Sequence, residues 1–327
     1  MSNQQEPGPQ GTATFRKGDA LDLTPAPTGA GRYAPSPTGE LHVGNLRTAL
    51  LAWAFARATD RKFYMRMEDL DRGRYRGVDQ QLADLRAFGI DWDGPVVTQS
   101  DRLNLYEDAL EHLKESGLVF ECYCSRKDIR EAVSAAHGHP DQYPGTCLHL
   151  SGAQRETRRA ELAKVGRRPA LRLKPSVETW TVHDVLHGNH TGRVDNVVLQ
   201  RGDGAFAYNL AVAVDDHLMG VDQVVRGEDL LTSAPVHSFL RHAFGGSEPT
   251  YVHVPLVLGP QGERLSKRDG AVTLKQLEDA GVGVSQLFQM VASSLGLPEV
   301  FDARHFLSVF PTASGRVDWS PWIFKRI

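Results

Sequence analysis

The feature that most constrains the fold is a strand, a helix and a second strand that follow one another early in the chain. Apolar patterning predicts a short strand at residues 32–34, a helix at 44–57 and a strand at 62–67. Such a unit joins two parallel strands by a right-handed crossover. We therefore predict an α/β, Rossmann-like fold whose ligand crevice lies at the carboxyl ends of parallel strands.

Helix and strand signals continue along the chain. Two further helices are predicted at residues 79–88 and 102–116, and the second begins at a cap formed by Ser100 or Asp101. We expect this second helix to bury four apolar residues: Leu103, Tyr106, Leu110 and Leu113. The remaining predicted elements are strands at residues 197–201, 205–208, 223–226 and 252–258, and a helix at 284–295.

The change of pattern after residue 118 marks an inserted module. Residues 1–28 are rich in Pro, Gly, Gln and Thr, and we expect a flexible tail there. Strand patterns near residue 197 are expected to resume the sheet. The predicted segments are a tail at 1–28, the first half of the Rossmann-like domain at 29–118, the insert at 119–193, the second half at 194–258, and a glycine-rich loop with a helical C-terminal region at 259–327.

The composition is that of an ordinary globular protein, with 41% apolar and 24% charged residues in a chain of 327. It has neither an apolar run of 18 residues nor a signal-peptide pattern, so we expect a cytosolic monomer without membrane contact. The net charge of -3 gives the chain no general attraction to nucleic acid or another polyanion. Binding of such a partner therefore requires a local basic patch. Residues 155–174 hold eight Lys or Arg against two Glu, which a solvated helix face and a phosphate-binding surface explain equally well.

Residues 32–45 read RYAPSPTGELHVGN and combine the first strand, a proline-stiffened loop and the start of the helix. A helix start offers unpaired backbone N–H groups and the positive end of the helix dipole, which suit a nucleotide phosphate. Neither a G-x-x-x-x-G-K-[ST] loop nor a G-x-G-x-x-G motif occurs in the chain, so a phosphate site here is of another type. The alternative is a helix cap with a surface histidine.

A second motif, RLSKR at residues 264–268, follows a predicted strand and lies among glycines, where an exposed and mobile loop is expected. Together with HVGN at residues 42–45, it resembles the paired HIGH and KMSKS motifs of the class I aminoacyl-tRNA synthetases. The APSPTG lead-in is similar to the glutamyl/glutaminyl branch of that family. The resemblance covers residues 31–271 and implies the Rossmann-like catalytic domain of a ligase that uses ATP.

The resemblance implies that His42, Gly44, Asn45 and Lys267 bind ATP, with His42, Asn45 and Lys267 in catalysis. Attack of a carboxylate on the α-phosphate builds negative charge on the phosphate oxygens and on the leaving pyrophosphate. A mobile lysine such as Lys267 neutralises this charge as it forms. Mg²⁺ is expected with the ATP, because it binds mainly through phosphate oxygens.

A glutamate pocket needs cations for two carboxylates and an acceptor for the ammonium group. Arg226 favours glutamate over glutamine, because a neutral side chain leaves a buried guanidinium unpaired. An ion pair with Glu228 or Asp229 is the alternative reading of Arg226. The full pocket implied by the resemblance is Arg32, Ala34, Ser36, Glu68, Tyr208 and Arg226.

The three cysteines, Cys122, Cys124 and Cys147, lie in one short stretch and suggest a metal site with three thiolates. Burial of three ordinary cysteines is the alternative. For the fourth ligand, general chemistry offers His137, His139 or His149. The Cys-x-Cys and Tyr-x-x-x-Cys spacing resembles the zinc site of shortened glutamyl enzymes, which implies a structural Zn²⁺ with Tyr143 as fourth ligand.

Residues 271–327, 57 in number, follow Gly270, whereas a separate domain usually takes about 100 residues. We therefore expect no anticodon-binding domain. The zinc spacing points to one subfamily, the glutamyl-queuosine tRNA(Asp) synthetases, which implies L-glutamate, ATP and queuosine-bearing tRNA(Asp) as partners. The alternatives are charging of tRNA(Glu) at its 3′ end and a non-catalytic RNA-binding paralogue.

Overall fold

The structure is a computed structural model of the chain. It describes residues 29–71, 77–135, 143–263, 272–311 and 319–324, with the backbone alone at residues 131–135. The predicted tail at 1–28, the RLSKR motif with Lys267, and two candidate metal ligands, His137 and His139, lie outside the described residues.

A seven-stranded sheet forms the centre of the molecule, in the order β3-β2-β1-β9-β10-β6-β7. All neighbouring strands are parallel except β6 and β7, which form an antiparallel hairpin at one edge. The predicted α/β fold with a parallel sheet is confirmed. The strands are β1 (Ala30–Tyr33), β2 (Lys62–Met67), β3 (Val97–Thr98), β6 (Thr179–Asp184), β7 (Gly188–Arg193), β9 (Val221–Gly227) and β10 (Thr250–Val254).

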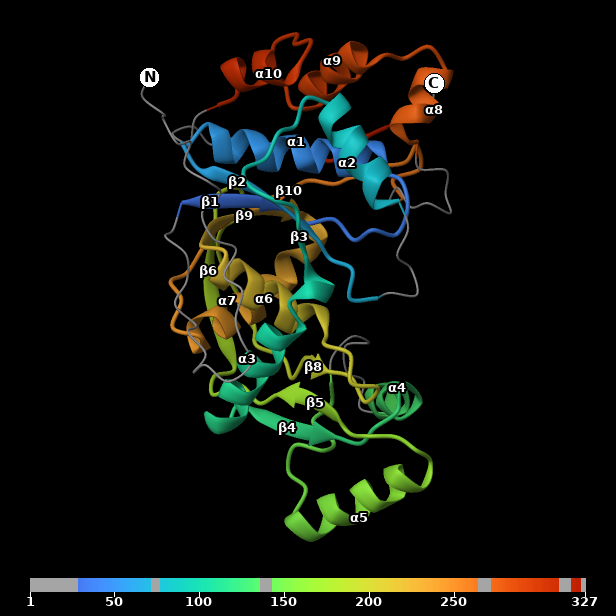
Figure 1. Cartoon of the computed structure of the whole chain (residues 1–327), viewed down its shortest axis with the longest axis vertical. Helices are drawn as coiled ribbons and strands as arrows, with labels where there is room; N and C mark the ends of the chain where they lie inside the picture. The colour runs from blue at the N-terminus through green and yellow to red at the C-terminus, as the bar shows by residue number, and fades with distance from the viewer. Residues whose placement is uncertain (1–28, 72–76, 136–142, 264–271, 312–318, 325–327) are drawn as a thin grey trace, which may run out of the picture.

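Helices cover both faces of this sheet, which explains why its inner strands β9 and β10 are buried along most of their length (Figure 1). One face carries α1 (Val43–Arg57), and the opposite face carries α6 (Tyr208–Leu218) and α7 (Ala234–Ala243). Other helices pack outside these: α2 (Val78–Ala87), α3 (Leu103–Glu115), α9 (Val284–Ser294) and α10 (Ala303–Val309).

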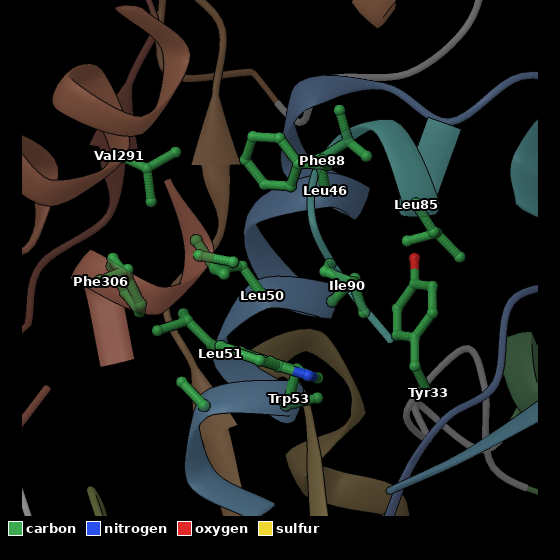
Figure 2. Packing of buried hydrophobic residues seen from close by; sticks show 14 of the residues in the cluster. Tyr33, Leu46, Leu50, Leu51, Trp53, Leu85, Phe88, Ile90, Val291 and Phe306 are labelled. Carbon is green, nitrogen blue, oxygen red and sulfur yellow. The ribbon is translucent and has the colours of Figure 1, made fainter. Parts of the chain in front are cut away.

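Helix α1 is buried on all sides, with 11 of its 15 residues inaccessible to solvent. Its residues Leu46, Leu50 and Leu51 lie in a cluster with aromatic rings from outside the sheet (Figure 2). Phe88, which follows α2, stacks on Phe288 of α9 with ring centroids 4.4 Å apart. The C-terminal helices therefore complete the core around α1.

The predicted helices at 44–57, 79–88, 102–116 and 284–295 are confirmed as α1, α2, α3 and α9. The predicted cap of α3 is wrong, because Ser100 and Asp101 form a 3₁₀ turn (Gln99–Asp101) and Arg102 is the N-cap residue. Leu103 is 40% exposed rather than buried, whereas the other three residues of the predicted stripe are inside.

The strand predicted at residues 205–208 is also wrong. Phe206 forms one isolated bridge to Gln200, and Tyr208 begins helix α6. The first turn of α6 follows Ala207, whose extended backbone makes it the N-cap residue. Both this helix and α7 bury polar residues, such as Asp216 and Arg241, which interrupt the apolar pattern that would mark the helices in the sequence.

A second, three-stranded antiparallel sheet has the order β4-β5-β8. Its strands are β4 (Val119–Cys122), β5 (Ala170–Leu173) and β8 (Val198–Gln200). We expected residues 197–201 to rejoin the central sheet, and that expectation is wrong, because β8 pairs with β5. An apolar pattern identifies a strand but not its neighbour.

Two helices border this small sheet, α4 (Arg126–Ala135) and α5 (Gly152–Lys164). Helix α5 lies at the end of the molecule farthest from the C-terminal helices (Figure 1). Of its residues, Leu162 alone is buried. The helix therefore presents almost its whole surface to solvent.

The C-terminal region contains a short helix, α8 (Leu274–Asp279), and a parallel pair of strands, β11 (Val257–Leu258) and β12 (Trp322–Ile323). A 3₁₀ segment, Glu228–Ser233, follows β9 and leads into α7. Among the described residues, no helix has both the length and the apolar content that crossing a bilayer requires.

Candidate active site

A cavity of about 830 Å³ opens at the carboxyl ends of β1, β2 and β9. This is the edge at which a parallel sheet binds its ligands. The structure brings together nine predicted site residues from four separate stretches of the chain. The cavity is lined by Arg32, Ala34, Ser36, His42, Gly44, Asn45, Glu68, Tyr208 and Arg226, and Lys267 is the one predicted residue of this site outside the described part of the chain.

The N-terminus of α1 forms one wall of the cavity. His42 is its N-cap residue, and its Nδ1 accepts a hydrogen bond of 3.3 Å from the backbone N–H of Asn45. In return the Asn45 side chain accepts one of 3.2 Å from the backbone N–H of His42. The first turn of α1 carries no acidic residue, so its positive dipole end is open to an anion.

Gly44 permits this arrangement. A Cβ atom at this position would lie 2.9 Å from Cε1 of His42, closer than carbon atoms pack. A larger residue would push the imidazole off the start of the helix. The HVGN sequence therefore has a steric reason for its glycine.

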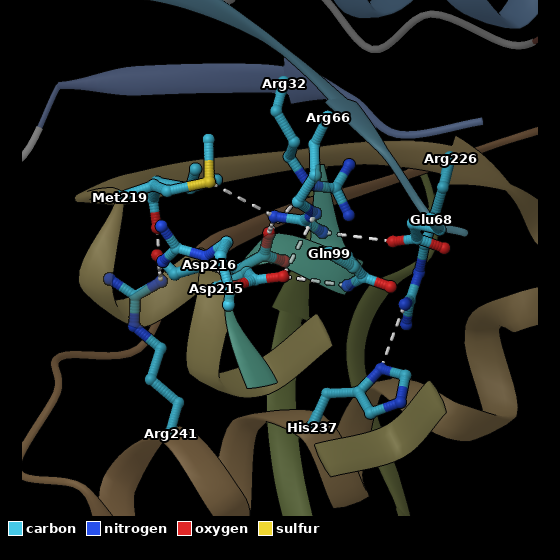
Figure 3. Close-up of polar contacts among 12 residues, drawn as sticks. Arg32, Arg66, Glu68, Gln99, Asp215, Asp216, Met219, Arg226, His237 and Arg241 are labelled. Atoms are coloured by element: carbon cyan, nitrogen blue, oxygen red, sulfur yellow. Dashed lines mark hydrogen bonds and ion pairs between the residues drawn. The ribbon is translucent and has the colours of Figure 1, made fainter. Parts of the chain in front are cut away.

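Buried charges form the floor of the cavity (Figure 3). Arg66 is fully buried in β2 and donates to Asp216 at 2.7 Å and to Glu68 at 3.1 Å. Arg32 donates through Nε to Asp216 at 3.1 Å and through Nη1 to the carbonyl of Val225 at 3.1 Å. Its Nη2 makes no hydrogen bond within the described part of the chain.

These pairs set the charges of the carboxyl groups. Burial acts against ionisation of Asp216, but Arg32 and Arg66 outweigh it and hold the pKa of Asp216 well below its usual range. Burial raises the pKa of Glu68, against the opposing effect of Arg66 and Arg32. Glu68 is thus a fixed acceptor whose negative charge a further cation stabilises.

Sequence reasoning missed three members of this network, Arg66, Asp215 and Asp216. Asp215 is inaccessible and accepts hydrogen bonds from Gln99 at 2.8 Å, Arg102 at 2.7 Å and Tyr106 at 2.8 Å. A signal existed, because charged residues inside an apolar strand and an apolar helix are stable only when paired. These pairs fix the positions of the residues that reach the cavity.

Arg226 lines the cavity on the side opposite the start of α1. Its Nε donates to Nε2 of His253 at 3.0 Å, Nη1 contacts Nδ1 of His237 at 3.0 Å, and Nη2 donates to the carbonyl of Leu230 at 3.1 Å. Among the described residues no carboxylate forms an ion pair with Arg226, so the alternative pairing with Glu228 or Asp229 is not observed.

The three cysteines converge in a separate place, on the small sheet. Their sulfur atoms lie within 4.8 Å of one another, close enough to hold a metal ion. The Tyr143 hydroxyl lies 3.4 Å from Cys122 Sγ and 4.0 Å from Cys124 Sγ, and Cys124 Sγ lies 3.5 Å from Cys147 Sγ. A tetrahedron with Zn–S bonds of about 2.3 Å has edges of about 3.8 Å, so this donor set fits zinc.

The electrostatics of the cluster favour ionisation of one thiol, Cys122, while the pKa values of Cys124 and Tyr143 are raised in the absence of a metal. A hydrogen bond with Cys124 is the main reason that the pKa of Cys122 is lowered to about 5, and Arg172 adds to the effect. The Arg172 guanidinium lies 4.1 Å from the centre of the Tyr143 ring. His149 is exposed and is not part of the cluster.

The basic stretch at residues 155–174 is divided by the fold. Arg172 is buried beside Tyr143 and does not belong to the surface. On α5, Arg158 pairs with Glu161, and Arg159 pairs with Glu121 and Glu156. Three exposed arginines form no ion pair with any described residue: Arg155, Arg167 and Arg168.

Comparison with known proteins gives a consistent result. Residues 30–308 match the family model of the class I tRNA synthetases (E and Q), catalytic domain. A Nocardia farcinica protein named glutamyl-Q tRNA(Asp) synthetase is 55% identical over 300 residues, which cover 91% of this chain and 94% of the relative. A Listeria welshimeri glutamate--tRNA ligase is 36% identical, and the alignment covers 90% of this chain but 64% of the ligase.

The fold is also found among solved structures. The glutamate-tRNA synthetase of Elizabethkingia anophelis superposes with a TM-score of 0.75 at 24% identity, covering 90% of this chain and 68% of that one. At this identity the likeness concerns the fold. It agrees with the parallel sheet and the ligand edge described above.

Proposed function

We infer the function from one premise, that the chain belongs to the class I tRNA synthetase family of the E and Q type. We propose that it activates L-glutamate with ATP and transfers the glutamyl group to queuosine in the anticodon of tRNA(Asp). The observation that carries this proposal is the 55% identity, over nearly the full length of both chains, to a protein named for that activity.

The proposed glutamate site uses both arginines of the cavity. Arg226 takes the side-chain carboxylate, and Arg32, through its remaining N–H groups, takes the α-carboxylate. Glu68, held by Arg66, accepts the ammonium group. Ala34, Ser36 and Tyr208 complete the pocket around the substrate.

The proposed ATP site lies at the start of α1. His42, Gly44 and Asn45 bind the phosphates there, and Lys267 neutralises charge on the pyrophosphate. Mg²⁺ would accompany the ATP and would offset the negative charge of its phosphates. The residues of the chain hold the two reactants in line, and no protein nucleophile is needed.

The proposed reaction has two steps. An oxygen of the glutamate α-carboxylate attacks the α-phosphorus, the bond to the bridging oxygen breaks, and pyrophosphate leaves. A hydroxyl of the queuosine side group then attacks the activated carbonyl, loses its proton and displaces AMP. The rate acceleration in both steps comes from positioning of the reactants and from stabilisation of the negative charge that develops on the oxygens.

The proposed metal is zinc, held by Cys122, Cys124, Tyr143 and Cys147. Four protein ligands leave no open position, so zinc here has a structural role. It ties β4 to the loop that carries Tyr143 and Cys147. Arg155 of α5 and Arg167 and Arg168 in the segment after it, which form no ion pair with a described residue, lie on the same module and suit an RNA backbone.

The experiment uses radiolabelled glutamate, ATP, and tRNA from cells with and without queuosine. We expect pyrophosphate exchange that depends on glutamate, and label on tRNA(Asp) only when queuosine is present. Glu68→Gln serves as the inactive control. Label on tRNA(Glu) or on queuosine-free tRNA would overturn the acceptor, and absence of exchange would overturn glutamate activation itself.

A further inference from the structure

Arg226 is held in a way that differs from Arg32, Arg66 and Arg102, the arginines that form ion pairs beneath the cavity. Arg32 and Arg66 pair with Asp216, and Arg102 pairs with Asp215, so carboxylates compensate their charges. Arg226 instead contacts two imidazoles, one backbone carbonyl and the face of the Tyr251 ring at 5.5 Å. It is 6% exposed.

The outer partners of the two imidazoles fix their tautomers. His253 donates from Nδ1 to Asp184 at 2.7 Å, which leaves Nε2 bare to accept from Arg226. His237 has its Nε2 2.9 Å from the side-chain oxygen of Asn209, so Nε2 carries the proton and Nδ1 accepts from Arg226. Both rings therefore face the guanidinium as neutral acceptors.

We propose that His237 and His253 are positioning and specificity-determining residues, which orient Arg226 by neutral acceptors and so leave its positive charge uncompensated for an incoming side-chain carboxylate. This inference rests on the proposed function and deepens it. A carboxylate partner would orient Arg226 equally well, but it would cancel the charge that distinguishes glutamate from glutamine.

The protonation of the two rings agrees with this role. Burial, aided by the charge of Arg226, lowers the pKa of His237 well below its ordinary value. Burial is also the main reason that the pKa of His253 is lowered, although Asp184 opposes the effect. Both rings thus stay neutral at neutral pH, and they add no second positive charge to the pocket.

The test compares two substitutions of equal size at one position. His237→Gln supplies a neutral acceptor and is expected to keep the KM for glutamate within about threefold of the wild type. His237→Glu supplies a charged acceptor and is expected to raise that KM about tenfold or more. Selectivity for glutamate over glutamine, as the ratio of kcat/KM in pyrophosphate exchange, should fall by a similar factor in His237→Glu alone.

Equal effects of the two substitutions on the KM and on the selectivity for glutamate would overturn the proposal, because the charge of the group that holds Arg226 would then have no influence on substrate binding. Thermal unfolding is measured for each variant, so that loss of folding is recognised. Wild-type protein that fails to exchange pyrophosphate with glutamate overturns the proposed function instead. The two failures are therefore distinguishable.

A milder second variant, Asn209→Asp, lies at a partly exposed residue and keeps the side-chain size. Its carboxylate favours a protonated His237, whose Nδ1 then no longer accepts from Arg226. We expect a KM for glutamate that rises as pH falls from 8.5 to 6.5, whereas the wild type stays flat, and a flat profile in the variant contradicts the proposal. The charged and titratable groups that face His237 are Arg226, Arg32, Asp216, His253 and Tyr208.

Discussion

The two ends of the molecule are stabilised by different means. Around α1 and the central sheet, 36 buried apolar side chains form one cluster in the described residues. The cluster on the small sheet holds six, and three of these, Cys122, Tyr143 and Cys147, are proposed metal ligands. Hydrophobic burial suffices for the first region. The small sheet shares a second apolar cluster with α3, α6 and α7 through Leu173 and Leu199, but its cysteine face has six side chains alone, and a metal ion would add a constraint there.

This difference suggests that the two regions serve different steps of the proposed reaction. The cavity is positioned by the large core and by the ion pairs of Arg66, Asp215 and Asp216, without help from the metal site. The small sheet carries α5 and its exposed arginines. We therefore expect activation of glutamate to depend on one region, and transfer to RNA to depend on both. The predictions below test this separation.

The largest effect is expected at the cavity. Arg226→Ala removes the cation proposed for the side-chain carboxylate and should lower kcat/KM for glutamate in pyrophosphate exchange about a hundred- to a thousandfold. Arg201→Ala, at an arginine that is 50% exposed, is the matched control and should leave exchange unchanged. Unaltered kinetics of Arg226→Ala would remove this residue from the pocket.

The metal site provides the converse test. Cys124→Ser should release the bound zinc and loosen the small sheet, so that transfer of glutamate to tRNA falls about a hundredfold while pyrophosphate exchange stays within about twofold. Zinc content, exchange and transfer are measured on the same preparation. Thr146→Ala, at an exposed neighbour of Cys147, is the control. A parallel loss of exchange would show that the two regions are not separable.

The exposed arginines on α5 and in the segment that follows it are expected to contribute less. Replacing Arg155 and Arg168 by alanine should weaken binding of tRNA about tenfold at low salt and reduce the slope of log affinity against log salt by about 1.5. Exchange should not change, because no residue of α5 or of the small sheet lines the cavity. A salt slope equal to that of the wild type would favour the solvated helix face that the sequence also allowed.

The smallest effect concerns stability near the cavity. His237 has a folded-state pKa well below the 6.5 of an unfolded histidine, so the unfolded chain binds more protons as pH falls. Stability is therefore lost below about pH 6.5, and at pH 5.5 this residue alone costs about 1 kcal/mol relative to pH 7. His237→Gln should lose less stability over that interval in chemical unfolding. An equal loss in both proteins would contradict the assignment.

The sequence was sufficient where a local pattern decides the structure. The strand at 62–67 and the helices at 44–57 and 284–295 carry periodic apolar residues, and the structure contains each of them. Helices α6 and α7 were not predicted, because polar residues that are buried only through distant partners, such as Asp216 and Arg241, interrupt their apolar pattern.

The residues of the candidate site show the same distinction between what a local pattern predicts and what distant contacts decide. Residues inside recognisable motifs, such as His42 and Glu68, could be assigned from the sequence, and the structure places them around one cavity. Arg66, Asp215 and His237 could not, because their roles depend on partners far away in the chain. Pairing of β8 with β5 is a further case, since a strand pattern carries no information about its neighbour.

The order of strands also has a consequence for the time course of synthesis. β1 lies between β2 and β9, and Ala30 of β1 pairs with Val221 of β9, which follows 191 residues later in the chain. At a translation rate of 5–20 residues per second, the first βαβ unit waits roughly 10 to 40 seconds for this neighbour. During that interval the edge of β1 and much of the apolar surface of α1 stay uncovered. A nascent chain of this kind is a natural substrate for chaperones, and slow codons within the insert would prolong its exposure.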